Sequence, residues 1–177
     1  MIDNVRPKVL LMSNVLCDKI EAHKMGLAHY AFSIIVSNSH NKILLQQRAL
    51  SKYHSGSLWT NACCGHPTSI DGIIDIQHQA ICRLYEEMGI NIGKLEYLFN
   101  FSYRGKCDCL IENEQDYVFF CKYDSEIRPN PDEVNDYKWM DLEDLDKDMK
   151  DHPNNYTLWF KEIWWNNKSQ LQTVIFR

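Results

Sequence analysis

The sequence lacks the marks of several protein classes. Only 7 of its 177 residues are glycine and 5 are proline, which excludes collagen-like and low-complexity chains. It has no basic excess, because its formal net charge is -5 and its isoelectric point is near 5.8. Non-specific binding to nucleic acid needs such an excess, so no nucleic-acid partner is expected. The longest apolar run near the N-terminus, residues 9–16, is interrupted by Ser13 and Asn14. This run is too short for a bilayer and lacks signal-peptide architecture, so we expect a cytoplasmic protein with no membrane partner.

The remaining composition is typical of a globular domain. The chain is 45% hydrophobic, 12% aromatic and 24% charged, and its length suits one domain over residues 1–177. No internal repeat, linker or charge block divides it. Its seven cysteines are an odd number without a repeated spacing. This favours reduced thiols, several of them packed as small apolar side chains, over a disulfide framework.

The hydrophobic pattern predicts strands, then one central helix, then closing helices. The expected strands are a short hairpin of 9–12 and 15–17, followed by 30–37, 42–47, 97–103 and 117–122. Apolar residues at positions 76, 80, 84 and 88, followed by Gly89, predict an amphipathic helix over 75–88. Helices are also expected over 141–149 and 156–166. This order predicts an α+β fold with a mixed or antiparallel sheet, and the chain has no Rossmann or Walker phosphate loop.

Four local clusters carry side chains that can do chemistry. They are His23 with His29, Cys64 with His66, Glu112 with Glu114, and Arg83 with Glu87. Each cluster alone is more often structural: histidines near a strand are usually solvated, and an Arg/Glu pair four residues apart on a helix is often a weak surface ion pair. Together, three imidazoles and two carboxylates can form an octahedral site for Mn²⁺, Zn²⁺ or Mg²⁺. Glu112 and Glu114 suit such a site because residues two apart on an extended chain point to the same side.

Six segments of the chain carry a family resemblance: AHKMGLAHYAFS (22–33), LLQQRALSK (44–52), WTNACCGHP (59–67), YEEMGI (85–90), ENEQDY (112–117) and NPDEV (130–134). Through them the chain resembles type I isopentenyl-diphosphate isomerase of the Nudix superfamily. They run in the family order from about residue 19 to about residue 165. The resemblance implies an α/β/α sandwich with a mixed sheet, preceded by an extra N-terminal hairpin. It also implies interconversion of isopentenyl and dimethylallyl diphosphate in isoprenoid biosynthesis.

The resemblance also implies roles for individual residues. His23, His29, His66, Glu112 and Glu114 match ligands of one divalent ion (Mn²⁺, Zn²⁺ or Mg²⁺), and Glu87 matches the carboxylate for a Mg²⁺ bound with the substrate diphosphate. The catalytic positions match Cys64, Glu114, Tyr103 and Trp159. The residues that match those holding the diphosphate are Lys19, Arg48, Lys52 and Arg83. The partner is a small prenyl diphosphate, and the chain is expected to be a monomer or a weak homodimer.

The implied reaction needs these residue types. Moving an unactivated double bond requires protonation of one carbon and deprotonation of another, through a tertiary carbocation that water would trap. An acid and a base must therefore stand on opposite sides of a closed, largely apolar pocket. A thiol and a carboxylate can serve as acid and base, and the face of Trp159 can stabilise the cation. The competing interpretation is that Trp159 is core, as helical tryptophans usually are.

Two other functions remain open at this point. The first is a Nudix hydrolase of a nucleoside or prenyl diphosphate. The hydrolase signature G-x5-E-x7-R-E-U-x-E-E-x-G-U is incomplete, because Ile74 replaces its first glutamate and Cys82-Arg83 replaces its Arg-Glu pair. The second is a zinc-stabilised module that uses Cys63, Cys64, His66, Cys107 and Cys109. The spacing of those residues matches paired C-x2-C knuckles poorly.

Overall fold

The computed structural model describes residues 7–69 and 74–177. Its strands are β1 (Lys8–Leu10), β2 (Leu16–Asp18), β3 (His29–Ser37), β4 (Ile43–Arg48), β5 (Trp59–Asn61), β6 (Cys63–Gly65), β7 (Glu96–Cys107), β8 (Leu110–Lys122) and β9 (Val134–Met140). Its helices are α1 (Lys19–Met25), α2 (Ile76–Met88), α3 (Leu142–Asp151), the 3-10 helix η1 (Pro153–Asn155) and α4 (Leu158–Ile175). None of the described helices is long and apolar enough to cross a membrane.

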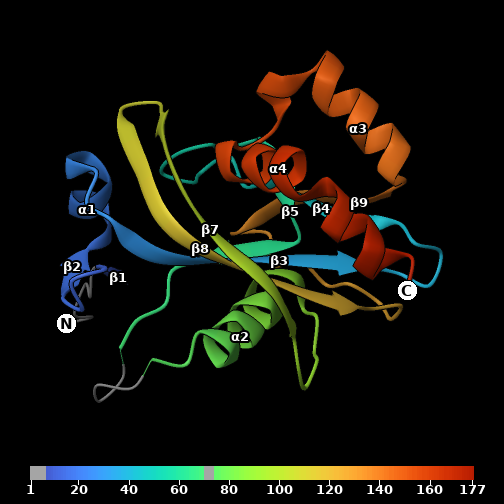
Figure 1. Ribbon diagram of the computed structural model, residues 1–177, viewed down its shortest axis with the longest axis horizontal. Coiled ribbons are helices and arrows are strands. Elements are labelled where there is room, and N and C mark those ends of the chain that lie inside the picture. The colour runs from blue at the N-terminus through green and yellow to red at the C-terminus, as the bar shows by residue number, and fades with distance from the viewer. Residues whose placement is uncertain (1–6, 70–73) are drawn as a thin grey trace.

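The main sheet has seven strands and is mixed, as predicted. Its order is β5-β4-β3-β8-β7, with β6 paired to β3 and β9 paired to β4. The β3–β8 pair is parallel, while the other described pairs of this sheet are antiparallel. Figure 1 shows α2 on one face of the sheet and α3 with α4 on the other. The predicted α+β class and sandwich layering are therefore confirmed.

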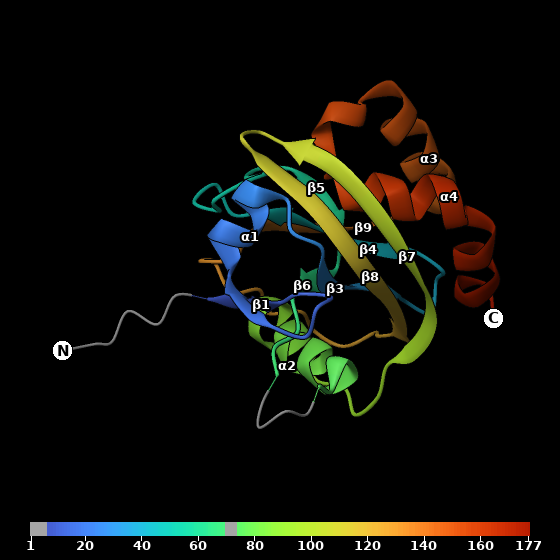
Figure 2. The same cartoon turned by 60° about the vertical axis from the view of Figure 1, so that its left-hand side comes forward.

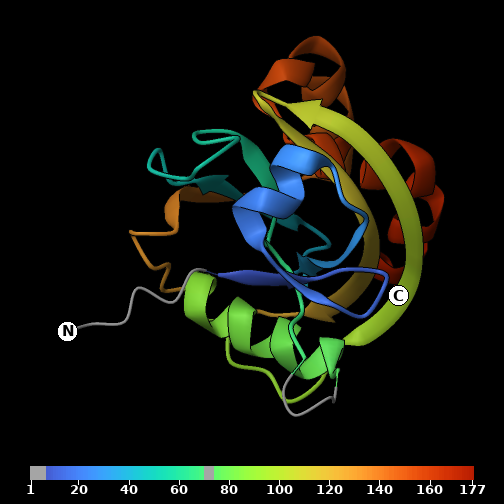
Figure 3. The same cartoon turned by 90° about the vertical axis from the view of Figure 1, so that its left-hand side faces the viewer.

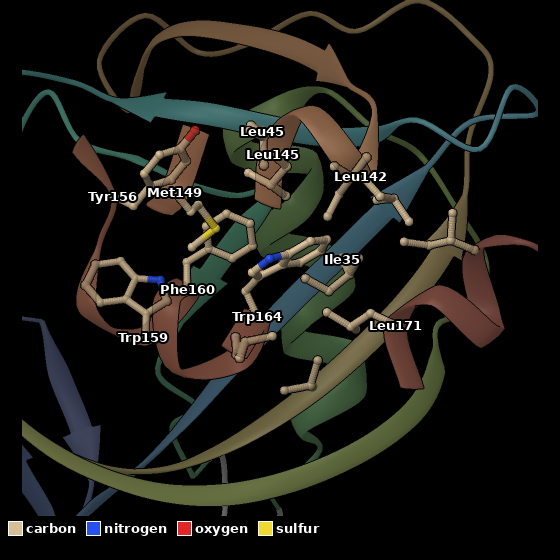
Figure 4. Close-up of a cluster of buried hydrophobic side chains, with 14 of the residues drawn as sticks. Ile35, Leu45, Leu142, Leu145, Met149, Tyr156, Trp159, Phe160, Trp164 and Leu171 are labelled. Carbon is tan, nitrogen blue, oxygen red and sulfur yellow. The ribbon is translucent and has the colours of Figure 1, made fainter. Parts of the chain in front are cut away.

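Side chains that alternate along the strands separate two hydrophobic cores. On β3, Ile34 and Val36 pack with α2, whereas Ile35 packs with α3 and α4. This is the period of two that a strand imposes. In the core under α4, Trp164 lies in the middle of the cluster and Trp159 lies at its edge (Figure 4). The sheet is thus covered by helices on both faces.

The predicted helix over 75–88 is α2. Asp75 caps its first turn, with its side chain accepting a hydrogen bond of 2.9 Å from the amide of His78. Gly89 ends it in the left-handed conformation, with φ of 67°, which costs a residue without Cβ little. The predicted hairpin is also present, because β1 and β2 pair antiparallel with Val9 opposite Cys17.

Helix α1 was not predicted, and it positions part of the site. It has only seven residues, begins after the Asp18 cap and ends at Gly26 with φ of 61°. Figures 2 and 3 show α1 lying against the strongly curved β7–β8 hairpin. There Asn113 Nδ2 donates a 2.9 Å hydrogen bond to the carbonyl of Gly26.

Several predicted boundaries were wrong. Glu112 and Glu114 do not precede the strand expected over 117–122 but lie inside it, because β8 begins at Leu110. The first part of β8 was missed because its buried face is polar: Glu112, Glu114 and Asp116 are all buried there, so no apolar alternation marks it. Helix α4 also continues beyond position 166 to Ile175, with a kink at Asn167. A tight turn joins Cys107, the last residue of β7, to Leu110, the first residue of β8, and Asp108 in this turn has φ of 56°.

Candidate active site

One cavity of about 680 Å³ opens beside the N-terminal half of β3. It is lined by ten of the residues singled out in the sequence: Lys19, Arg48, Lys52, Cys64, His66, Arg83, Glu87, Glu112, Glu114 and Trp159. Three other predicted residues, His23, His29 and Tyr103, contact Glu112 or Glu114 from behind the cavity wall. The structure therefore gathers side chains from segments far apart in the sequence.

The three histidines and two glutamates predicted as metal ligands form one compact cluster. One donor atom from each of His23, His29, His66, Glu112 and Glu114 lies within 4.8 Å of all the others. His23 Nε2 is 3.3 Å from Glu112 Oε2, and His29 Nε2 is 3.3 Å from Glu114 Oε1. The spacing in the sequence permitted this cluster, and the fold forms it.

Four segments of the chain bring these donors together. His23 projects from the last turn of α1, and His29 is the first residue of β3. The parallel register of β3 and β8 places His29 directly opposite Glu114. His66 follows β6, on the other edge of β3, and its Nε2 lies 2.8 Å from Glu114 Oε1.

The hydrogen bonds of the rings leave a place for a cation. His23 Nδ1 lies 2.6 Å from the carbonyl of Lys19, and His29 Nδ1 lies 2.8 Å from the carbonyl of Leu27. A carbonyl only accepts, so each Nδ1 carries a proton and each Nε2 turns toward the carboxylates. Both Nε2 atoms are buried without a hydrogen-bond partner. Such a backbone contact on the far nitrogen is how metal-bound histidines are usually oriented, so the donors fit a divalent ion.

A proton can occupy the same place when no ion is bound. The pKa of His29 is raised: burial opposes this, but the negative charge of the Glu114 carboxylate, 3.3 Å away, outweighs it. Glu114 also accepts a 2.5 Å hydrogen bond from the Tyr103 hydroxyl. Binding of an ion would displace the proton from His29, which couples occupancy of the cluster to pH.

The two adjacent cysteines face opposite sides of the sheet. Cys64 pairs with Ser33 and lines the cavity, whereas Cys63 pairs with Ile34 and lies in the core beneath α2. Burial raises the pKa of Cys64 to about 12, although the Arg48 guanidinium, 3.9 Å from the sulfur, acts in the opposite direction. Cys64 is therefore a neutral thiol that still holds its proton at neutral pH.

The predicted diphosphate contacts lie at another end of the cavity. Arg83 Nη2 lies 2.6 Å from Glu87 Oε1 and 2.8 Å from Glu133 Oε2. Lys52 forms an ion pair with Glu133 and lies 3.8 Å from Glu87. Glu87 also accepts a 2.8 Å hydrogen bond from Gln46. These cations are already paired with carboxylates.

Trp159 belongs to both the core and the cavity. Its side chain is packed in the cluster under α4, and it also lines the cavity. The guanidinium carbon of Arg48 lies 5.1 Å from the indole ring, and the ring of His54 meets it edge-on at 5.9 Å. The two interpretations of Trp159 in the sequence are thus compatible.

Tyr53, His54 and Glu133 also line the cavity, and none of them had a predicted role. Glu133 lies in the NPDEV segment, so the resemblance marked the segment but assigned the residue nothing. Burial lowers the pKa of His54 to about 3, which keeps its ring neutral. The zinc-module hypothesis is not supported within residues 7–69 and 74–177, because the donor groups found there contain neither Cys63 nor Cys64 nor Cys109.

Comparison with known proteins identifies the family. A family model described as NUDIX domain matches residues 27–160. The chain is 44% identical over 142 residues to an isopentenyl-diphosphate Delta-isomerase 2 from Aromatoleum aromaticum. The matched region covers 80% of this chain and 73% of that protein. The chain is also 39% identical over 154 residues to an isopentenyl-diphosphate Delta-isomerase from Photobacterium profundum, covering 84% of each chain. The chain belongs to this NUDIX-domain family.

Solved structures agree with this assignment at the level of the fold. The crystal structure of a Nudix hydrolase from M. smegmatis matches with a TM-score of 0.56 at 16% identity and covers 95% of this chain and 96% of that one. A MutT protein from Methanosarcina mazei matches with a TM-score of 0.56 at 14% identity, covering 67% and 80% of the two chains. The resemblance seen in the sequence is therefore confirmed for family and fold.

Proposed function

We propose that the protein interconverts isopentenyl diphosphate and dimethylallyl diphosphate, acting as an isomerase in isoprenoid biosynthesis. The names of its relatives support this reaction. The observation that carries the proposal is the placement of Cys64 and Glu114. They lie on the two strands that flank β3, opposite Ser33 and His29 respectively, and both line one cavity. The two strands are about 9.5 Å apart across β3, and the two pairing positions are four residues, or about 13 Å, apart along it. The backbones therefore leave room for a five-carbon group between the two side chains.

An acid and a base on two sides are what double-bond migration needs. The neutral thiol of Cys64 can give its proton to the terminal carbon of the substrate, and the carboxylate of Glu114 can accept one from the carbon on the other side. Tyr103, hydrogen-bonded to Glu114, orients that carboxylate. Trp159 presents an aromatic face to the tertiary cation, an attraction worth about 2 kcal/mol when desolvated.

The charged groups hold the remote part of the substrate. Lys19, Arg48, Lys52 and Arg83 line the cavity and can bind the diphosphate oxygens, with Arg48 and Arg83 able to do so through two N–H groups. Glu87 is the ligand we assign to a Mg²⁺ that arrives with the diphosphate. The five-donor cluster of His23, His29, His66, Glu112 and Glu114 holds a resident divalent ion, separate from this Mg²⁺. When bound, that ion supplies a fixed positive charge. Anchoring at the diphosphate then aligns the reacting carbons.

The proposal also covers the location, domain organisation and oligomeric state of the protein. We place the protein in the cytoplasm, as a single domain that is a monomer or a weak homodimer. Sedimentation at several concentrations measures the oligomeric state directly, and a stable higher oligomer would refute that part of the proposal.

One experiment tests the reaction and its main competitor together. Purified protein with Mg²⁺ and isopentenyl diphosphate is incubated in D₂O, and deuterium in the recovered diphosphates is measured by mass spectrometry. The proposal predicts carbon-bound deuterium, formation of dimethylallyl diphosphate and no phosphate release. Phosphate release without deuterium incorporation would replace the isomerase with a hydrolase. The incomplete hydrolase signature around Cys82 and Arg83 argues for the first outcome.

A further inference from the structure

A second group of buried donors lies next to the five-donor cluster. Donor atoms of His54, Cys107 and Glu112 lie within 4.8 Å of one another. All three residues are buried, with at most 8% of their surface exposed. They come from three separate elements: the connection between β4 and β5, the end of β7, and β8. No role assigned above uses His54 or Cys107.

The two oxygens of Glu112 face two different histidines. Oε2 lies 3.3 Å from His23 Nε2, within the five-donor cluster, while Oε1 lies 3.1 Å from His54 Nε2. Oε1 is buried and has no hydrogen-bond partner. The other nitrogen of His54 is engaged by the neighbouring hydroxyl, with Nδ1 3.1 Å from Ser55 Oγ. An unpartnered carboxylate oxygen aimed at a ring nitrogen is costly unless a cation lies between them.

We propose that His54 Nε2, Cys107 Sγ and Glu112 Oε1 bind a second resident ion, Zn²⁺, with Glu112 bridging it to the ion of the five-donor cluster. Zinc binds imidazole, thiolate and carboxylate at about 2.0–2.3 Å, so its tetrahedral ligands lie about 3.3–3.8 Å from one another. Separations below 4.8 Å need only small side-chain movements to reach this geometry. A thiolate ligand favours Zn²⁺ over Mg²⁺ or Mn²⁺, which prefer oxygen ligands.

The ion would join two parts of the cavity wall. Residues 49–58 connect β4 and β5 and include Lys52, Tyr53 and His54, all of which line the cavity. Coordination ties this segment to the tip of the β7–β8 hairpin. When zinc binds, the thiol of Cys107 loses its proton to solvent and the charge of Glu112 is shared between two ions. The site exists independently of the proposed reaction, so its test does not depend on turnover.

The test counts ions and identifies the sulfur ligand. The full-length protein is dialysed against excess Zn²⁺ and analysed for bound metal, and a parallel sample is loaded with Co²⁺. The proposal predicts two bound zinc ions per chain and a near-ultraviolet thiolate-to-cobalt charge-transfer band. Cys107→Ser and His54→Ala should each bind one ion, and Cys107→Ser should lose the band.

Two controls separate this site from its neighbours. Cys109→Ser removes an exposed thiol two residues away and should keep both ions and the band. His29→Ala should lose the other ion while retaining the band. Circular dichroism verifies that each variant is folded, and His54→Ala provides the same count if Cys107→Ser does not fold. One ion in the wild-type protein, or an undiminished band in Cys107→Ser, would overturn the proposal.

Discussion

The two ends of the cavity hold charge in different ways. At the imidazole end, defined by His23, His29, His66, Glu112 and Glu114, the side chains of His23 and Glu112 are 0% and 2% exposed. The Nε2 atoms of His23 and His29 face carboxylates there without hydrogen bonds. At the basic end, defined by Arg48, Lys52, Arg83, Glu87 and Glu133, Arg83 and Glu133 are 28% and 24% exposed and already paired. The first end is arranged to hold a cation. In the second end, Lys52 and Arg83 already pair with Glu87 and Glu133.

This difference indicates when each end acquires its ligand. Buried acceptors that face one another are stabilised only by a resident cation or proton, so the imidazole end should be occupied before substrate arrives. The cations of the basic end can exchange their carboxylate partners for a diphosphate, which leaves Glu87 and Glu133 in need of a positive partner. A Mg²⁺ ion that enters with the substrate meets that need.

The largest expected effect concerns the thiol between the two ends. Cys64 lies beside Arg48 and two residues before His66. Cys64→Ala and Cys64→Ser should lower kcat by about 10³-fold, because removal of a general acid typically costs 10²–10⁴-fold. Cys63→Ala is the matched control, since that thiol points into the core beneath α2, and it should lose some stability but retain turnover. A comparable loss of kcat in Cys63→Ala would assign the chemistry to the wrong thiol.

A second prediction sharpens the order of metal binding. Substrate-free protein should contain a divalent ion at the imidazole end and none at Glu87. Chelation should lower the free energy of unfolding by about 4 kcal/mol if the ion is present at a thousandfold excess over its dissociation constant. Melting curves with and without chelator, together with anomalous diffraction from substrate-free crystals, test this. Chelator should lower the melting temperature of the variant His29→Ala less than that of the wild-type protein, because the variant has already lost this ion. An ion at Glu87 but none among the histidines would reverse the proposed order.

The sequence predicted the imidazole end better than the elements that carry it. The two-residue spacing of Glu112 and Glu114 correctly placed both on one side of an extended segment. The part of β8 that carries them was nevertheless missed, because its buried residues are acidic. Helix α1 and strands β5 and β6 have only seven, three and three residues. Segments this short carry too few residues for a period to appear, and their structure depends on tertiary pairing.

The missed part of the basic end has a similar cause. Glu133 lies in the connection before β9, where backbone bonds from Ala49 to Glu133 and from Asn130 to Glu87 hold it beside α2. These bonds join segments more than forty residues apart, so no local sequence pattern predicts them. Only the folded chain places Glu133 against Lys52 and Arg83.

Trp159 should give a smaller effect than the thiol. Trp159→Leu keeps apolar volume but removes the aromatic face, and a loss of about 2 kcal/mol of cation–π attraction lowers kcat about 30-fold. Trp159→Phe keeps a face with a weaker quadrupole and should retain appreciable turnover. The loss should fall on kcat rather than KM, because the cation exists only near the transition state.

A second tryptophan separates this role from packing. Trp164 is fully buried in the same cluster, its indole N–H lies 3.2 Å from Asp146, and it does not line the cavity. Trp164→Leu should therefore lower the melting temperature while the folded protein turns over normally. If Trp159→Leu behaves in that same way in melts and kinetics, Trp159 only packs and the cation-facing role is wrong.

The smallest expected effect lies at the basic end itself. Arg83→Gln removes one diphosphate contact but leaves Glu87 its bond to Gln46 and its neighbour Lys52. We expect KM to rise about tenfold with kcat almost unchanged, because the contact is made equally in the ground state and the transition state. Arg128→Gln is the matched control: Arg128 is 78% exposed, pairs with Glu126 and does not line the cavity, so its loss should leave both constants unchanged. Steady-state kinetics over a range of substrate concentrations decide the matter. A fall in kcat at constant KM would mean that Arg83 acts on the reacting carbons, and the division of the cavity into a binding end and a reacting end would fail.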